Sequence, residues 1–386
     1  MNGKRFYISI ILIVVLSNFG IFSVGGRAVT ASELLMLYLI GKYFLSSSVR
    51  KSKASYLFLF LGFFPIINIL TSIDAFESLK AVIPLEFYMI FSFVLIGRSE
   101  NERRIIIRSF IYANVIAAVY GIIQFIIIRV IGLNIGYQLA HPWGNFTALR
   151  GEMNYISRSR YLWRSNSFFS EPSLLGLFSI ASLVLLDKCD FKNKRVLIVV
   201  FVGSTICSLS ASALVGLFFL LILRMIMSKK HRLVLWPVAI VCIIFILPSF
   251  MMSVGRISEL ISPGSSGYMR ITAPLKYVGY VFRELPFGTG LGALEKYLSS
   301  SEYLSNQFRL AGGGVYIWVS NTILIWFIAY GYIGILVFSL FLYFLYVLRN
   351  NSTIYIAFAC LLFHVATGSF YSTIEWVFLI PFLCIP

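Results

Sequence analysis

The sequence predicts an all-α, polytopic integral membrane protein, and its composition and hydropathy carry this prediction. Of its 386 residues, 59% are hydrophobic and only 12% are charged, and the mean hydropathy is +0.89. A membrane-spanning helix needs about 20 apolar residues, so about twelve transmembrane helices would use about 240 positions and leave only loops between them. A soluble domain of average composition is therefore excluded, and any chemistry must use helix ends, loops or a cavity between helices.

Apolar runs supply the predicted helices. The first run follows Lys4 and Arg5 and resembles a signal peptide, but residues 25–28 make a poor small-residue cleavage site, so we interpret it as an uncleaved span. No internal repeat, Pro-rich linker or low-complexity tract is evident, so residues 1–386 are predicted to form a single domain. In chain order, the runs cover residues 6–24, 31–45, 56–73, 81–96, 105–131, 168–186, 196–209, 211–227, 233–251, 321–347, 354–367 and 376–385.

The formal net charge of +17 would suggest nucleic-acid binding in a soluble protein, but here it predicts topology. The spans place most basic residues on the side of the N-terminus, which is the pattern of cytoplasmic loops. Basic clusters at 188–195 and 229–232 flank the apolar stretch 196–227, so we divide this stretch at 208–211 to return both clusters to the cytoplasm. Both termini are then predicted to be cytoplasmic, and nucleic-acid binding loses its main support.

Two segments on the opposite face, residues 132–167 and 253–320, are long enough to build a site as periplasmic loops. The first ends with arginines interleaved with aromatic residues. Guanidinium groups bind phosphate oxygens bidentately, and amphipathic rings offer flat apolar faces that suit sugars. The same composition is equally typical of an interfacial belt that meets lipid headgroups. The residues concerned are Arg158, Arg160, Tyr161, Trp163 and Arg164.

A polar motif, Arg164 followed after four residues by Phe169-Ser170-Glu171-Pro172-Ser173, opens the run at 168–186. Proline fits the first turn of a helix because it lacks the N–H that would be unpaired there. The helix would then direct its free amides and positive dipole end outward, where an anion could bind. Glu171 beside this end could act as a base or orienting carboxylate, or it could only complement the dipole, worth about 0.3–1 kcal/mol.

This motif resembles the signature of Wzy-type bacterial polysaccharide polymerases, within the superfamily of O-antigen polymerases and ligases. Two later stretches resemble the same family, in the expected order. Arg270 with the turn at 286–292 is similar to the family's external arginine and its Pro-and-Gly turn, and the stretch 321–334 is similar to its Asn-led helix. The resemblance covers about residues 164 to 345. Ligases often carry a His just before the Asn, so Ser320 favours a polymerase.

The resemblance implies an inner-membrane glycosyltransferase that joins oligosaccharide repeat units, carried on undecaprenyl pyrophosphate, at the periplasmic face for O-antigen, capsule or exopolysaccharide. It implies Arg164 and Arg270 as cations for developing charge and Glu171 as an acid–base or orienting residue. The implied partners are the lipid-linked oligosaccharide and membrane lipid, with a chain-length regulator and a flippase beside them, and no cofactor. The implied substrate-binding residues are Arg158, Arg160, Tyr161, Trp163 and Asn321.

No aspartate pair for a sugar-nucleotide metal is found, and the five cysteines lack metal-ligand spacing, so a metal-independent reaction is predicted. The Gly290-x-Gly292 sequence is interpreted as a turn, because no strand precedes it. His364, inside a span, is expected to pair with a neighbouring helix. Two alternatives stay open: an O-antigen ligase that moves finished polymer to a lipid A core, and a flippase, which would be expected to show related halves and midplane charges.

Overall fold

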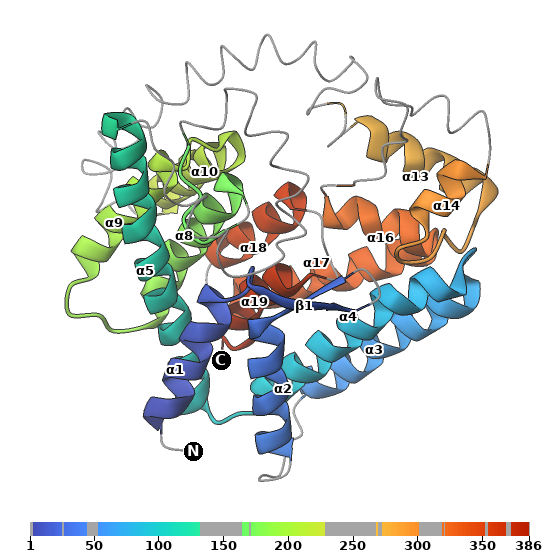
Figure 1. The fold of residues 1–386 in the computed structure, drawn as a ribbon, viewed down its shortest axis with the longest axis horizontal. Coiled ribbons are helices and arrows are strands. Elements are labelled where there is room, and N and C mark those ends of the chain that lie inside the picture. Colours follow the sequence, from blue (N-terminus) through green and yellow to red (C-terminus); the bar gives the residue numbers. More distant parts are fainter. Residues whose placement is uncertain are drawn as a thin grey trace.

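The computed structural model describes residues 3–24, 27–44, 53–131, 164–169, 171–227, 268, 272–300, 319, 321–351, 354–367 and 372–385. These ranges are almost entirely helical, which confirms the all-α prediction (Figure 1). Within the described ranges, two helices are long and apolar enough to cross a membrane, Ala75–Ile96 and Glu100–Ile131, and shorter apolar helices accompany them. The number of spans stays a prediction. The run at 233–251 and most of the two predicted periplasmic loops lie outside the described residues.

The N-terminal apolar run is divided, so the single span predicted at 6–24 is wrong. Helix α1 (Gly3–Val15) is followed by a small antiparallel pair, β1 (Gly20–Val24) and β2 (Arg27–Thr30). Polar residues end the helix: Ser17 Oγ donates to Val14 O at 2.9 Å, and Asn18 Nδ2 donates to Phe168 O at 3.2 Å. Such side chains offer the backbone partners that compete with helical hydrogen bonds.

Helix α2 (Ala31–Phe44) begins with a complete capping box. Thr30 Oγ1 accepts from Glu33 N at 3.3 Å, while Glu33 Oε2 accepts from Thr30 N at 2.7 Å. The second carboxyl oxygen of Glu33 accepts from the hydroxyls of Tyr88 and Thr373, which come from two other helices. This buried carboxylate therefore joins three helices that are distant in the sequence.

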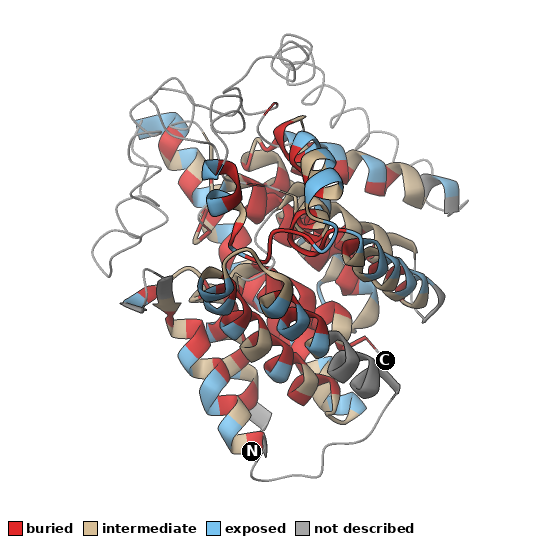
Figure 2. Cartoon of the chain, turned by 90° about the vertical axis from the view of Figure 1, so that its right-hand side faces the viewer, coloured by how far each residue is buried: buried red, intermediate tan, exposed pale blue. Residues whose placement is uncertain are grey.

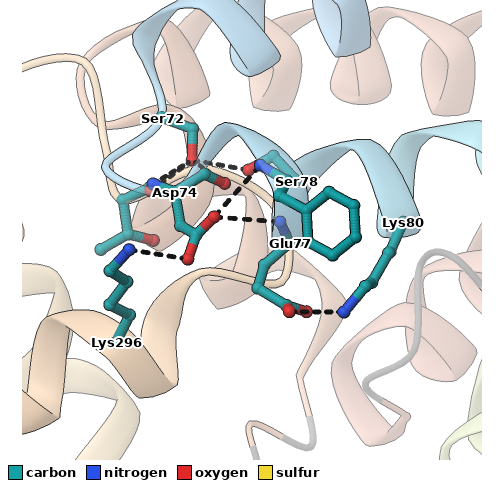
Figure 3. A network of polar contacts seen from close by, with 8 residues as sticks. Ser72, Asp74, Glu77, Ser78, Lys80 and Lys296 are labelled. Atoms are coloured by element: carbon teal, nitrogen blue, oxygen red, sulfur yellow. Dashed lines mark hydrogen bonds and ion pairs between the residues drawn. The ribbon is translucent and has the colours of Figure 1, made fainter. Parts of the chain in front are cut away.

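Helices α3 (Lys53–Thr71) and α4 (Ala75–Ile96) form a hairpin whose turn is fixed by Asp74 (Figure 3). The Asp74 carboxylate caps α4 by accepting from Phe76 N at 3.1 Å and Glu77 N at 3.2 Å. Its other oxygen pairs with Lys296 Nζ at 2.9 Å, and Lys296 belongs to α14 (Leu294–Ser299). The hairpin turn is thereby tied to a segment more than two hundred residues later in the chain.

A second group of helices surrounds α8 (Pro172–Leu185), which continues into the 3-10 helix η1 (Leu186–Lys188). Residues 173–185 of α8 are all buried, because α5 (Glu100–Ile131), α9 (Lys194–Cys207), α10 (Ala211–Met227) and α18 (Ile354–Ala366) pack around it. Helices α9 and α10 are separated at residues 208–210, where Leu209 has a φ of 45°. This confirms the division of the stretch 196–227, which the sequence predicted from charge alone.

The run predicted as one helix at 321–347 is broken, and the reason is Gly331. Following α13 (Ala273–Glu284), α16 (Thr322–Tyr330) ends at Gly331, which has a φ of 56° and a ψ of −130°, and α17 (Ile333–Asn351) then begins. A Cβ at Gly331 would lie 2.3 Å from Pro286 O. The nine residues of α16 rise only about 14 Å, which is too short for a bilayer core of about 30 Å.

Buried residues gather at the centre of the bundle, and exposed residues lie on the outer helix faces (Figure 2). At the centre, Phe178 of α8 and Phe363 of α18 pack against Phe378 of α19 (Thr373–Leu383), with ring centroids 5.2 Å and 3.6 Å away. Several outer faces are apolar: Leu70 is 82% exposed and Val130 is 78% exposed. A protein surrounded by water rarely presents so much apolar surface, so these faces suit a membrane.

Candidate functional site

The segment that carries Arg164 is anchored on α5 by one side chain, that of Gln124. The Gln124 Oε1 atom accepts from Asn166 N at 3.1 Å and from Ser167 N at 2.8 Å, and it lies 3.0 Å from Ser165 Oγ. Its Nε2 atom donates to Asn166 Oδ1 at 2.9 Å. A side-chain amide has both donors and an acceptor, so one buried residue satisfies three consecutive residues of the segment.

Two buried serines complete this anchorage. Ser165 Oγ lies 2.6 Å from Gly121 O, and Ser167 Oγ donates to Ala117 O at 2.7 Å. Both oxygens that accept are backbone carbonyls of α5, one turn apart. Ser167 has a φ of 55°, an uncommon conformation for a residue with a side chain, which the surrounding hydrogen bonds maintain. The segment is therefore a defined structure and not a loose linker.

Arg164 is half-buried at the start of this segment, against the turn between α9 and α10. Its Nε atom donates to Ser208 O at 3.2 Å, and the next residue continues the contact, since Ser165 N donates to Cys207 O at 3.3 Å. The bond at Nε fixes the plane of the guanidinium, and such a planar fork suits phosphate oxygens. The α9–α10 turn, which the sequence indicated only as a break in topology, thus forms one wall of the candidate site.

Glu171 lies at the N-terminus of α8, as predicted, and Pro172 is the first residue of the helix. The carboxylate is exposed and makes no capping hydrogen bond to the helix, although its residue occupies the N-cap position. Instead, Glu171 Oε2 accepts from Ser173 Oγ at 2.9 Å. A carboxylate at this place can orient a hydroxyl or accept a proton from it, in addition to complementing the helix dipole.

Asn321 and five other predicted site residues differ in whether they belong to the described part of the chain. Asn321 is described, and it caps α16 through its Oδ1 atom, which accepts from Leu324 N at 3.1 Å. This contact gives Asn321 a structural role, and its predicted part in substrate binding stays a prediction. The residues that lie outside the described part of the chain are Arg158, Arg160, Tyr161, Trp163 and Arg270.

The Pro-and-Gly turn at 286–292 is a turn, as predicted, and it contacts the Asn-led helix directly. Thr289 N donates to Ile328 O at 2.9 Å, and Gly290 N donates to Ala329 O at 3.1 Å. Asn68 of α3 adds a second support, because its Oδ1 atom accepts from Leu291 N at 2.6 Å while its Nδ2 atom donates to Ala329 O at 2.7 Å. Two of the three motif stretches are therefore one structural unit.

Comparison with protein families decides the assignment of the whole chain. The family model described as WcaD colanic acid polymerase matches residues 6–385. The chain belongs to this family. Searches among curated proteins and among solved structures found no significant match. Membership in the WcaD family confirms the resemblance to Wzy-type polymerases and supports a polysaccharide repeat-unit polymerase, a glycosyltransferase-type enzyme whose substrate is a lipid-linked oligosaccharide.

The WcaD family polymerase also buries polar residues that sequence reasoning did not select. Glu375 of α19 accepts from Thr322 Oγ1 at 2.5 Å, and its Oε1 atom lies 3.8 Å from His364 Nε2. His364 thus lies beside a residue of a neighbouring helix, and its pairing stays a prediction. Gln124 and Asn68 are polar residues inside apolar runs, and that position was the available signal, whereas Glu375 directly precedes the run at 376–385. No group of three or more His, Cys, Asp or Glu residues that could hold a metal occurs within the described residues.

Proposed function

We propose that this WcaD family polymerase joins oligosaccharide repeat units carried on undecaprenyl pyrophosphate, at the periplasmic face of the inner membrane and without a metal ion. The family match over residues 6–385 is the observation that supports a polymerase most strongly. The distribution of basic residues supports cytoplasmic termini and a site on the opposite face. The anchored segment 164–169, together with Glu171 at the start of α8, supports the location of the chemistry.

In the proposed reaction, the acceptor hydroxyl of a new lipid-linked repeat attacks the anomeric carbon of the growing chain. The bond from that carbon to the pyrophosphate oxygen breaks, and the pyrophosphate leaves on its lipid with the bonding electron pair. The acceptor hydroxyl releases its proton as the new glycosidic bond forms. Pyrophosphate is already a good leaving group, so the protein contributes mainly stabilisation of developing charge and placement of the hydroxyl.

Arg164 has the geometry for the first of these contributions, because the α9–α10 turn fixes its guanidinium. Arg270 is the second proposed cation. Arg158, Arg160, Tyr161, Trp163 and Asn321 are proposed to bind the sugar and the lipid pyrophosphate. Glu171, exposed at the start of α8, is proposed to orient the acceptor hydroxyl or to accept its proton.

Reconstitution tests the proposal. Purified protein in nanodiscs is given only undecaprenyl pyrophosphate-linked repeats together with a metal chelator, and the products are separated on gels. A ladder of longer oligomers with release of lipid pyrophosphate is expected. Transbilayer movement of the substrate by correctly folded protein without a ladder would establish a flippase instead. Transfer of polymer to a supplied lipid A core, again without a ladder, would establish a ligase.

Two variants test the proposed roles in the same assay. Arg270→Ala should abolish long products while the protein stays inserted, because one positioned cation is commonly worth about two orders of magnitude in rate. Glu171→Gln should slow the ladder by about 10²–10⁴-fold, with little change in substrate binding, if the carboxylate orients or accepts the proton. An unchanged rate for Glu171→Gln would leave the carboxylate only its electrostatic effect on the helix end.

A further inference from the structure

A cavity of about 340 Å³ opens between α1, α5 and the segment that precedes α9. It lies far from the Arg164 segment, because Arg108 in its wall precedes Gln124 by sixteen residues of the same helix, or about 24 Å. The side chains that give the cavity its character are the rings of Tyr7, Tyr112 and Phe191, the cations Arg108 and Lys192, and the carboxylate of Asp190.

Arg108 is held in this cavity by neutral groups. Its Nη2 atom donates to the backbone oxygen of Asp190 at 3.0 Å, and its guanidinium carbon lies 6.0 Å from the centre of the Phe191 ring. A guanidinium has five donors in a fixed fork, and the backbone bond positions that fork without neutralising its charge. Across the described ranges, neither Arg108 nor Lys192 has a carboxylate within ion-pair distance.

Three other basic residues, one each on α5, α9 and α10, differ from Arg108 in this respect. Arg104, one turn earlier on α5, pairs with Glu100 at 2.7 Å. Lys194 and Arg224 both pair with Asp187, at 2.5 Å and 3.0 Å. The cavity therefore contains two cations outside any ion pair and one carboxylate, so the sum of its charges is positive and it fits an anion.

An apolar strip on α5 leads away from the cavity. Tyr112 lines the cavity, and Ile116, Val119 and Ile123 continue along the same helix face at spacings of three and four residues. These side chains are 42%, 47%, 41% and 47% exposed. Tyr7 meets the Tyr112 ring edge to face at 5.9 Å. Amphipathic rings of this kind lie at the headgroup level of a membrane. An anion-binding cavity that continues into an apolar strip has the two parts that a phospholipid needs.

We propose that this cavity binds an anionic phospholipid of the cytoplasmic leaflet, with phosphatidylglycerol as the headgroup class. Arg108 and Lys192 contact the phosphate, and an acyl chain lies along the strip from Tyr112 to Ile123. The cytoplasmic placement follows from the distribution of basic residues, and basic pockets between helices on this face bind anionic headgroups. The site is independent of the proposed polymerase reaction, which uses the other end of α5.

Lipid retention tests the proposal on the full-length protein. Wild type and variants are purified in detergent, exposed to equal amounts of dioleoyl phosphatidylglycerol, phosphatidylethanolamine and phosphatidylcholine, and analysed by native mass spectrometry. Phosphatidylglycerol should be retained preferentially by wild type. Arg108→Gln should reduce its retention about fivefold, the usual effect of one basic residue near a membrane surface. Arg104→Gln removes the same charge one turn away, from a residue already paired with Glu100, and should change retention less than twofold.

A variant that removes a negative charge from the cavity provides a second test, because it should increase lipid retention. Asp190→Asn removes the only carboxylate among the residues that line the cavity and should increase retention of phosphatidylglycerol. Loss of phosphatidylethanolamine in this variant would instead identify an ethanolamine site and overturn the proposal. Equal losses from Arg104→Gln and Arg108→Gln would also overturn it, because they would reveal only a basic surface. Displacement of the lipid by inorganic phosphate would identify a site for a soluble anion. None of these results depends on polymer formation.

Discussion

Two motif segments of this polymerase, residues 164–169 and the turn at 286–292, are fixed in different ways. The first is fixed by side chains, because Gln124 and two serines bond it to α5. The second is fixed mainly by its backbone, which bonds to α16 and to the side chain of Asn68, and by glycines that leave no room for a side chain. A segment fixed by side chains can be loosened one hydrogen bond at a time, whereas a segment fixed by close backbone approach tolerates almost no change.

This difference between the two segments predicts two kinds of effect for substitutions. Substitutions in the 286–292 turn should act through folding, since the turn joins α3 to the break between α16 and α17. Substitutions around 164–169 should act mainly on activity, since they alter the placement of Arg164 while the surrounding helices keep their packing. Four predictions test this contrast.

The largest effect is expected for Gly288→Ala. Gly288 has a φ of 85°, and a Cβ would lie 2.2 Å from Ala329 O, a backbone atom that cannot turn away. The strained conformation alone costs about 1–3 kcal/mol, and the overlap adds to it. We expect little folded protein by size-exclusion chromatography and a lower thermal midpoint. Gly279→Ala is the matched control, because a Cβ there meets nothing within 4 Å and alanine favours a helix by about 1 kcal/mol.

Arg164→Ala should leave the protein folded and lower the initial rate of ladder formation by about two orders of magnitude, since it removes a positioned cation. Arg164→Lys should also be slow, because lysine has no Nε donor for Ser208 O and no planar fork. Arg195→Ala, at the other end of α9, provides the control for lost charge and should retain the wild-type rate. A normal rate for both Arg164 variants would remove this residue from the site.

Gln124→Met should lower the rate about tenfold, because two backbone N–H groups of the segment lose their acceptor and Arg164 is positioned less well. Gln124→Glu keeps an acceptor and should retain more activity. Combining Gln124→Met with Arg164→Ala should cost less than the product of the two single effects if Gln124 acts through Arg164. Asn114→Leu, buried on the same helix and bonded to Phe110 O within it, should show no such coupling.

The smallest expected effect is on the pH dependence of thermal stability, through Asp74 in the turn between α3 and α4. The hydrogen bond from Lys296 lowers the pKa of the partly buried Asp74 carboxyl below its usual value of about 3.9. A lowered folded-state pKa contributes stability that is complete above about pH 4 and is lost as the pH falls through the folded value. Thermal midpoints should therefore fall below pH 4, and Lys296→Gln should reduce that fall. Identical acid sensitivity in Lys296→Gln would contradict this linkage.

The parts of the site that could be predicted from the sequence are those in which a local pattern of residues is compatible with only one local structure. Pro172 opens α8, Glu171 lies at its N-terminus, and residues 290–292 form a turn. Gln124, Asn68 and Glu375 were not predicted, because their importance comes from partners 40 to 260 residues away in the chain. No local pattern specifies such a partner. The predictions of single helices at 6–24 and 321–347 were wrong, because hydropathy alone cannot detect the end of a helix inside an apolar run.

Two sequences with the same spacing separate the features that neighbouring residues specify from those that depend on how the helices pack. Thr30-x-x-Glu33 and Ser372-x-x-Glu375 have the same capping-box spacing, and each marks the start of a helix, α2 or α19. Only the first forms the box, while Ser372 makes no capping hydrogen bond and Glu375 is bonded to Thr322 of α16. Composition and spacing determine that a helix forms and where it begins, because these depend on neighbouring residues. The partner of a buried carboxylate is decided by which helices pack beside it, because a buried polar group must bond to whatever donor that packing supplies.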